Sequence, residues 1–312
     1  MSTTSEPTDD RPADRAAGGH AVALAAPRKV TRRQWLRRTT WGAYAAALGV
    51  IVETFFIEPH WLEIVRRDLP IRNLPVHWQG RTLAQISDIH VGRQVSDSFL
   101  IGAFERVAAI GADVVALTGD FVTCGRRDSS VPIQQAVDVF AHLPRGKIAT
   151  LGILGNHDYG PNWSDRFIAA RVETVLSDAG VKMLRNESIG LDGLTIVGLD
   201  DLLANRCNGN AGFAGTSQHT ARLVLCHNPD AADRDIWNGY EGWILSGHTH
   251  GGQCKPPFFP PPALPVANRR YTAGEFELQG NRRMYINRGL GHLLPVRFNC
   301  RPEITIFQLT AG

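Results

Sequence analysis

The sequence predicts a mixed α/β domain with a core of two sheets and helices outside it. In the first half of the chain, apolar segments rich in β-forming residues alternate with segments of helical periodicity. The second half instead contains short strand-like segments separated by turn residues. The 312 residues are 43% hydrophobic and 20% charged, which excludes wholesale disorder and provides enough apolar material for a large core.

The first half predicts successive strand–helix units. Its last helix is expected to be capped by Ser164 and to end at Gly180. Because strands and helices alternate, the strands should pair in parallel βαβ units. Strands are predicted at residues 83–87, 113–118 and 147–154, and helices at residues 98–110, 131–143 and 164–179.

The second half predicts strands with few helices between them. Turn residues such as Asp192-Gly193 separate neighbouring segments. The layout of both halves suggests a mixed two-sheet core with outer helices. Strands are predicted at residues 181–184, 187–191, 194–199, 222–226, 243–245, 274–279, 283–287 and 303–309.

The N-terminal part differs from the rest in charge and pattern. Residues 1–40 carry a net charge of +4 and the remaining residues sum to −1, so no nucleic-acid partner is expected for the folded domain. Residues 1–30 lack an apolar period and are expected to be a disordered tail. Residues 31–58 are interpreted as a twin-arginine signal or anchor segment, and residues 59–312 as the folded domain.

The signal interpretation rests on Arg32 and Arg33, which precede an apolar run at residues 41–57 and resemble the start of a twin-arginine export signal. The alternative is a basic patch before an ordinary buried helix. The run is shorter than the roughly 20 residues that span a bilayer comfortably. No convincing cleavage site follows it, so an uncleaved anchor is favoured over a released protein. The expected partners are the twin-arginine export machinery and the cytoplasmic membrane, with the domain at the outer, periplasmic face.

Five short motifs carry side chains that favour metal chemistry. Four of them end a predicted strand, and ligands of open α/β sheets bind beyond the carboxyl ends of the strands. Carboxylates and imidazoles gathered there suit divalent transition metals. Each motif alone is more often a turn or a satisfied histidine, so the specific signal is their combination and order. They are Ser87-Asp88-Ile89-His90, Thr118-Gly119-Asp120, Gly155-Asn156-His157-Asp158, Cys226-His227-Asn228-Pro229 and Gly247-His248-Thr249-His250.

This series of motifs resembles the calcineurin-like metallophosphoesterases over residues 61–309. The resemblance implies a four-layer αββα sandwich and two divalent metal ions (manganese, iron or zinc) at the carboxyl edge of the strands. It also implies that a hydroxide bridging the metals attacks a phosphoester. Carried over, the first metal takes Asp88, His90, Asp120 and His250. The second takes Asp120, Asn156, His227 and His248, so that Asp120 bridges the two.

Two further residues are expected to be catalytic by the same resemblance. His157 would face the substrate, stabilise developing charge and help to protonate the leaving oxygen. Asp158 would hold the tautomer and orientation of His157.

Further segments, including Asn287-Arg288-Gly289 and the proline-rich residues 256–265, resemble a bacterial branch of membrane-associated phosphoesterases. That branch includes enzymes that cut UDP-2,3-diacylglucosamine. The expected function is therefore hydrolysis of a phosphodiester or pyrophosphate bond, in a lipid or cell-envelope substrate. The alternatives are a phosphomonoesterase and a non-catalytic binding scaffold on the same fold.

Three smaller features keep two interpretations each. Phe258 and Phe259 either line a lipid-facing groove or pack their loop down, with packing favoured. Arg288 either binds a substrate phosphate or forms a structural ion pair. Asp200 and Asp201 either support the metal ligands or form a solvated turn, with the turn favoured.

Overall fold

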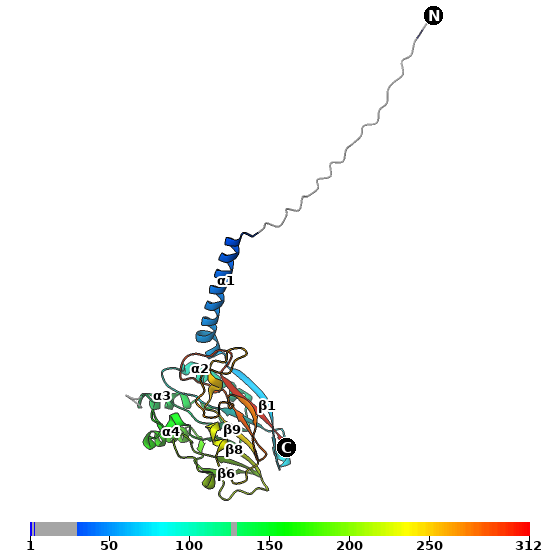
Figure 1. Cartoon of the computed structure of the whole chain (residues 1–312). Coiled ribbons are helices and arrows are strands. Elements are labelled where there is room, and N and C mark those ends of the chain that lie inside the picture. Colours follow the sequence, from blue (N-terminus) through cyan, green and yellow to red (C-terminus); the bar gives the residue numbers. More distant parts are fainter. Residues whose placement is uncertain (2, 4–29, 126–129) are drawn as a thin grey trace. The chain divides into compact units, whose positions relative to one another are not determined.

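The computed structural model describes residues 1, 3, 30–125 and 130–312. It contains two compact units, Met1–Ala47 and Leu48–Gly312. Nearly all of the tail expected at residues 1–30 lies outside the described residues. The structure is shown in Figure 1, where colours follow the chain.

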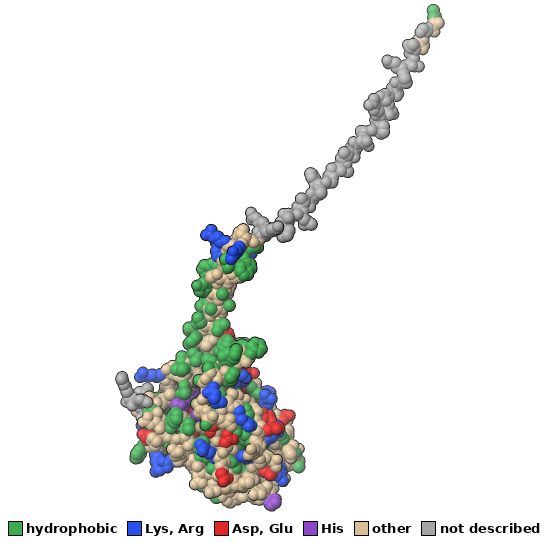
Figure 2. Space-filling model, in the orientation of Figure 1, with side chains coloured by type: hydrophobic (Ala, Val, Ile, Leu, Met, Phe, Trp, Pro, Cys, Tyr) green, Lys and Arg blue, Asp and Glu red, His purple; other side chains and the backbone are tan. Residues whose placement is uncertain are grey.

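The N-terminal helix α1, Arg32–Val52, has no buried side chain. This contradicts the alternative of an ordinary buried helix. Its surface is mostly hydrophobic, as Figure 2 shows. One π-helical turn, η1 (Glu53–Ile57), and one 3-10 turn, η2 (Glu58–His60), follow it. Within the described chain, Arg32–His60 is one helical segment of 29 residues that is long and apolar enough to cross a membrane.

The first sheet contains the predicted parallel units. Strands β2 to β5 pair in parallel in chain order, which confirms the expectation from the alternating pattern. The N-cap of α4 is Asp165, whose carboxylate accepts the amides of Phe167 and Ile168; the prediction of Ser164 was one residue early. The elements are β2 (Thr82–Ile86), α2 (Asp97–Ile110), β3 (Val114–Leu117), α3 (Ser130–Phe140), β4 (Ala149–Gly152), η4 (Asn156–Tyr159), α4 (Arg166–Asp178) and β5 (Lys182–Met183).

Two long strands complete this sheet beyond β2. Strand β12, Glu303–Ala311, was predicted and pairs antiparallel with β2. Strand β1, Glu63–Ile71, was not predicted, because its middle is charged and its burial does not alternate. It pairs in parallel with β12 over its whole length. The turn η3 (Val76–Trp78) then leads to β2.

The second sheet has the order β10-β11-β9-β8-β7-β6. Strands β7, β8, β9 and β11 run parallel to one another, and β6 and β10 pair antiparallel with β7 and β11 at the two edges. All of these strands were predicted to within a few residues. The elements are β6 (Glu187–Leu191), β7 (Leu194–Gly198), α5 (Gly209–Gly212), β8 (Ala221–Leu225), η5 (Pro229–Asp233), β9 (Gly242–Ser246), η6 (His250–Gly252), β10 (Gly274–Glu277) and β11 (Arg282–Ile286).

The core is divided into three layers by the two sheets. Alternate residues of β2 and β3 face either helices α2 to α4 or the other sheet, because side chains on a strand alternate between faces. Figure 1 shows these helices together on one side of the domain. The outer face of the second sheet is covered by loops and the short turns α5 and η5, around Phe213, Trp237 and Tyr240. The expected two-sheet sandwich is confirmed, with a thin fourth layer.

Glu58 joins the segment before β1 to the end of the last loop. Its side chain is buried. Its carboxylate accepts the backbone amide of Asn299 at 2.7 Å and that of Cys300. A buried carboxylate that accepts two amides stabilises the fold because neither partner has water as a substitute.

We therefore expect Glu58→Ala to lower the free energy of unfolding by about 1–3 kcal/mol, the cost of leaving buried amides unsatisfied. Thermal and urea unfolding of the full chain in detergent would measure the change. Glu53→Ala is the control, since Glu53 is only half-buried and lies one turn earlier. Equal losses for both variants would show that the amide contacts contribute little.

Candidate dinuclear metal centre

All five motifs lie at the carboxyl ends of strands, directly after β2, β3, β8 and β9 and two residues beyond the end of β4. The first three belong to one sheet and the last two to the other. Parallel strands that end at the same edge bring their motifs together. The site therefore lies where the corresponding edges of the two sheets meet.

The predicted ligands form two buried clusters. In each cluster, the ligand atoms lie within 4.8 Å of one another. Asp120 contacts both clusters, because its Oδ2 lies 3.2 Å from His227 Nε2 and 3.7 Å from His90 Nε2. The clusters are Asp88, His90 and His250, and Asp120, His227 and His248.

Three of the histidines are held by a hydrogen bond on one ring nitrogen. His227 Nδ1 donates to the carbonyl of Thr118 at 2.7 Å, and His248 Nε2 donates to the carbonyl of Pro265 at 2.8 Å. His90 Nδ1 is bonded to Thr123 Oγ1 at 2.8 Å. Such an outer contact fixes the ring and leaves the other nitrogen for a metal.

The atoms that point into the clusters have poor partners among the described residues. His90 Nε2 and His250 Nε2 face each other at 3.0 Å. Both side-chain polar atoms of Asn156 are buried without a hydrogen bond, as are His227 Nε2 and His248 Nδ1. Buried polar atoms are almost always satisfied. This donor set of carboxylate, imidazole and amide therefore fits divalent cations of the first transition row.

Burial favours neutral imidazoles at His90 and His248, whereas at His227 burial is outweighed by the charge of Asp120, which raises the pKa well above its ordinary value. Burial lowers the pKa of His90 to about 3 and that of His248 to about 4. Burial alone would raise the pKa of Asp120, but the charges of His227 and His157 bring it well below its ordinary value. Neutral imidazoles and an ionised central carboxylate are the states that bind metals.

The backbone at the ligands is unusual. A positive φ is uncommon in residues other than glycine, and such strain is concentrated at functional sites. Gly247 is required beside them, because a Cβ there would lie 1.9 Å from Ser87 Oγ. The left-handed ligands are Asp88 (φ 52°), His90 (53°), Asp120 (57°), His248 (71°) and His250 (50°).

His157 lies beside the clusters rather than inside one. Its ring meets that of His90 edge-on, with centroids 5.2 Å apart, and its amide donates to Asp120 Oδ1 at 2.8 Å. The ring of Trp163 also meets that of His157 edge-on, with centroids 6.1 Å apart. No pattern in the sequence indicated Trp163, which lies in a loop six residues further on.

Asp158 has partners other than the expected one. Its Oδ2 accepts the amides of Gly155 at 2.8 Å and Asp120 at 3.0 Å, and its Oδ1 accepts those of Phe121 and Val122. All four donors are backbone groups. Asp158 therefore ties the loop after β4 to the loop after β3, and the expectation that it also orients the ring of His157 stays a prediction.

The structure decides between the two interpretations given for the acidic pair, the arginine and the two phenylalanines. Asp200 and Asp201 are buried, so the favoured solvated turn was wrong; Asp200 accepts from Tyr159 and Arg185. Arg288 forms the structural ion pair, with Glu63 and Glu303. Phe258 and Phe259 are exposed, so the favoured packing of their loop was also wrong.

The structural role of Arg297, in the loop between β11 and β12, was not predicted from the sequence. Arg297 is fully buried and donates to the carbonyls of Gly289, Gly291 and Cys300. These contacts fix the loop that packs on Asp88 through the amide of Gly291, which donates to the Asp88 carbonyl at 2.7 Å.

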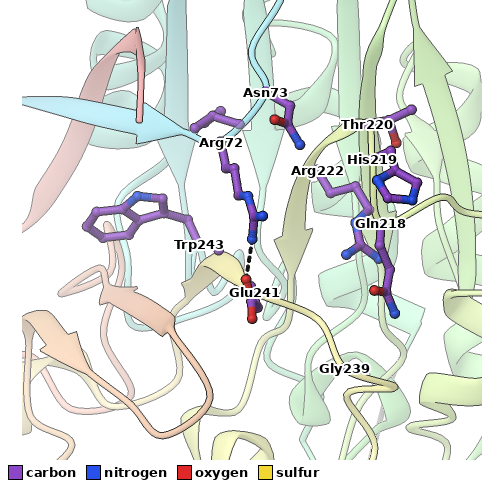
Figure 3. A pocket seen from close by; sticks show the side chains of 11 residues that line it. Arg72, Asn73, Gln218, His219, Thr220, Arg222, Gly239, Glu241 and Trp243 are labelled. Carbon is purple, nitrogen blue, oxygen red and sulfur yellow. Dashed lines mark hydrogen bonds and ion pairs between the residues drawn. The ribbon is translucent and has the colours of Figure 1, made fainter.

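A separate cavity of about 200 Å³ lies away from the metal clusters (Figure 3). It is lined by residues at the end of β1 and at the starts of β8 and β9, the opposite ends of these strands from the ligands. Arg72 and Glu241 form an ion pair across it. It takes no part in the metal centre.

Comparison with known proteins agrees with this geometry. The family model for calcineurin-like phosphoesterases matches residues 81–252. The chain is 31% identical to the metallophosphoesterase YkuE of Bacillus subtilis, over 90% of this chain and 98% of that protein. It is 30% identical to the phosphodiesterase YaeI of Escherichia coli, over 90% and 99%.

A third relative is the UDP-2,3-diacylglucosamine pyrophosphatase LpxG of Chlamydia muridarum, 26% identical over 81% of this chain and 90% of that protein. The family match includes all five motifs and all seven predicted ligands. The chain therefore belongs to the calcineurin-like phosphoesterase family of metal-dependent hydrolases.

Proposed function

We propose that this hydrolase cleaves a phosphodiester or pyrophosphate bond at a centre of two divalent cations. The observation that carries the proposal is the pair of buried ligand clusters that meet at Asp120. Asp88, His90, Asp120 and His250 would hold one cation. Asp120, Asn156, His227 and His248 would hold the other. When bound, two such cations activate water and neutralise phosphoryl oxygens.

The remaining residues have distinct proposed roles. His157 stands at the edge of the clusters, where its ring can contact the substrate, stabilise developing charge and donate a proton to the leaving oxygen. Asp158 is a positioning residue that keeps the loops carrying Asp120 and His157 together. Trp163, which packs edge-on against the His157 ring, would limit the movement of that ring.

The proposed substrate is a phosphoester of a lipid or of the cell envelope. One relative supports this choice by its printed activity, the UDP-2,3-diacylglucosamine pyrophosphatase, and the phosphodiesterase supports the type of bond cleaved. The exposed apolar helix α1 supports an enzyme that works next to a membrane. We further propose that the segment at residues 31–58 is a twin-arginine anchor that holds the domain at the periplasmic face.

The two alternatives predict different catalysis. A phosphomonoesterase would prefer p-nitrophenyl phosphate to the bis-p-nitrophenyl ester. A binding scaffold would hydrolyse neither ester with added Mn²⁺. The proposal expects metal-dependent hydrolysis of the diester that EDTA abolishes.

The first prediction concerns the shared carboxylate. Asp120→Ala should abolish diester hydrolysis and reduce bound metal, because both clusters lose a ligand. It should also remove the thermal stabilisation that metal adds, since a ligand that binds only the native state stabilises it. Elemental analysis and thermal unfolding measure both effects. Asp138→Ala, an exposed carboxylate on α3, is the control. Retention of two metals per chain in Asp120→Ala would refute the ligand assignment.

The second prediction concerns His157. His157→Ala should keep both metals but lower kcat by roughly 10²–10⁴-fold, the usual range for a lost acid–base group. The loss should be smaller for a p-nitrophenolate leaving group, which needs little protonation. Steady-state kinetics with good and poor leaving groups provide the measurement. An equal loss for both would argue against proton donation.

Asp158→Asn provides the contrast to His157→Ala. Its amide nitrogen would face backbone donors in place of an acceptor, so the variant should also lose thermal stability. Its loss of rate should not depend on the leaving group, because Asp158 acts through the loops.

The third prediction concerns the export route. Arg32→Lys combined with Arg33→Lys keeps the charge but should trap the protein in the cytoplasm, because export signals of this kind are read by a receptor. Arg37→Lys with Arg38→Lys is the matched control. Cell fractionation distinguishes the outcomes, and normal export of the first variant would remove the twin-arginine interpretation.

A further inference from the structure

Three segments of the domain expose large apolar side chains. They are residues 54–60, 253–262 and 293–299, and we refer to their shared surface as the apolar face. Most large apolar residues of the domain are buried, which makes this exposure unusual. The exposed fraction is 70% for Phe56, 103% for Phe258, 68% for Phe259 and 64% for Leu294.

Hydrogen bonds hold these segments side by side. The amide of Arg297 donates to the carbonyl of Thr54 at 3.0 Å, and the amide of Lys255 donates to that of Phe298 at 2.8 Å. Gln253 Nε2 donates to the carbonyls of Leu294 and Val296. The apolar face is therefore one continuous surface built from three distant parts of the chain.

The apolar face borders the metal centre. The carbonyl of His250 accepts the amide of Gln253 at 3.0 Å and the thiol of Cys300 at 3.1 Å. His248 is bonded to Pro265, three residues beyond the second segment. A membrane or protein that binds to the apolar face would therefore lie next to the predicted metal ligands.

The charge of the face suits the surface of a bilayer. The carboxylate of Glu58 is buried against backbone amides, and the guanidinium of Arg297 is buried against carbonyls. Lys255 is the one exposed charge in the three described segments. At the border, Arg301 lies 4.2 Å over the half-exposed ring of Trp61. Aromatic residues with basic neighbours are typical of membrane interfaces.

The first segment of the apolar face also indicates that a lipid bilayer, rather than a protein, covers the face. Residues 54–60 are the end of the 29-residue apolar segment Arg32–His60. The exposed apolar surface thus continues directly from a segment with the composition of a membrane span. A protein partner would not explain this continuity.

We propose that the apolar face docks on the lipid bilayer and holds the metal centre at the membrane surface. Docked in this way, the centre can reach a phosphoester at the headgroup level while the acyl chains of the lipid stay in the bilayer. This inference rests on the proposed membrane association through residues 31–58.

The experiment uses the full chain in vesicles of phosphatidylethanolamine and phosphatidylglycerol. In a Cys207→Ser, Cys254→Ser background, which removes the two partly exposed thiols, an NBD fluorophore is attached at one introduced cysteine at a time. The variants are Phe259→Cys on the apolar face, Tyr44→Cys on α1 and Val76→Cys as the control. Val76 is 82% exposed and follows β1, whose end lies at the edge opposite the ligands.

We expect NBD at position 259 to emit at shorter wavelength and to be quenched by doxyl-labelled lipids, while NBD at position 76 stays in water. Quenching at 44 but equal, weak quenching at 259 and 76 would overturn the apolar-face proposal alone. Absence of quenching at position 44 would overturn the proposed membrane association. A shift at 259 that grows with protein density without lipid quenching would indicate a second copy of the chain, and would also overturn docking on lipid.

Discussion

The arrangement of the domain depends on one electrostatic constraint. The ligand atoms of the metal centre are buried close together, where some repel one another and others have no hydrogen-bond partner among the described residues. His90 and His250 face each other through ring nitrogens, and Asn156 is buried with both polar atoms unpaired in the described structure. Such a site is costly without cations. The family's two metals supply the missing positive charge, so metal binding and stability of this edge are coupled.

The fold supports this edge with buried carboxyl and guanidinium groups whose hydrogen bonds go to the backbone. Asp158 accepts four amides from two loops, Arg297 donates to carbonyls of the last loop, and Glu58 accepts two amides. The backbone amides and carbonyls in these contacts are already fixed by the fold. Only the charged side chain therefore loses conformational entropy when the hydrogen bonds form. They explain how strained, left-handed ligand residues stay in place.

Much of the fold and the site was predictable from the sequence because both depend on local patterns. Buried parallel strands are short apolar runs, and each is followed by its motif, so the edge and the ligands were found together. What the sequence did not reveal depends on tertiary contacts. Strand β1 is held by pairing with β12 rather than by its own pattern. The burial of Asp200 arises from Tyr159 and Arg185, which come from other elements.

The position of the apolar face follows from strand direction. β1 is parallel to β12, and β12 is antiparallel to β2, so β1 begins at the edge where β2 ends. That edge carries Asp88 and His90, the residues after β2. The segment before β1 must therefore enter the domain beside the metal centre. An apolar segment attached there can bring a bilayer to the ligands without any inserted lid, and exposed apolar residues on the two neighbouring loops widen that contact. The topology of one edge strand thus links the proposed membrane attachment to the proposed chemistry.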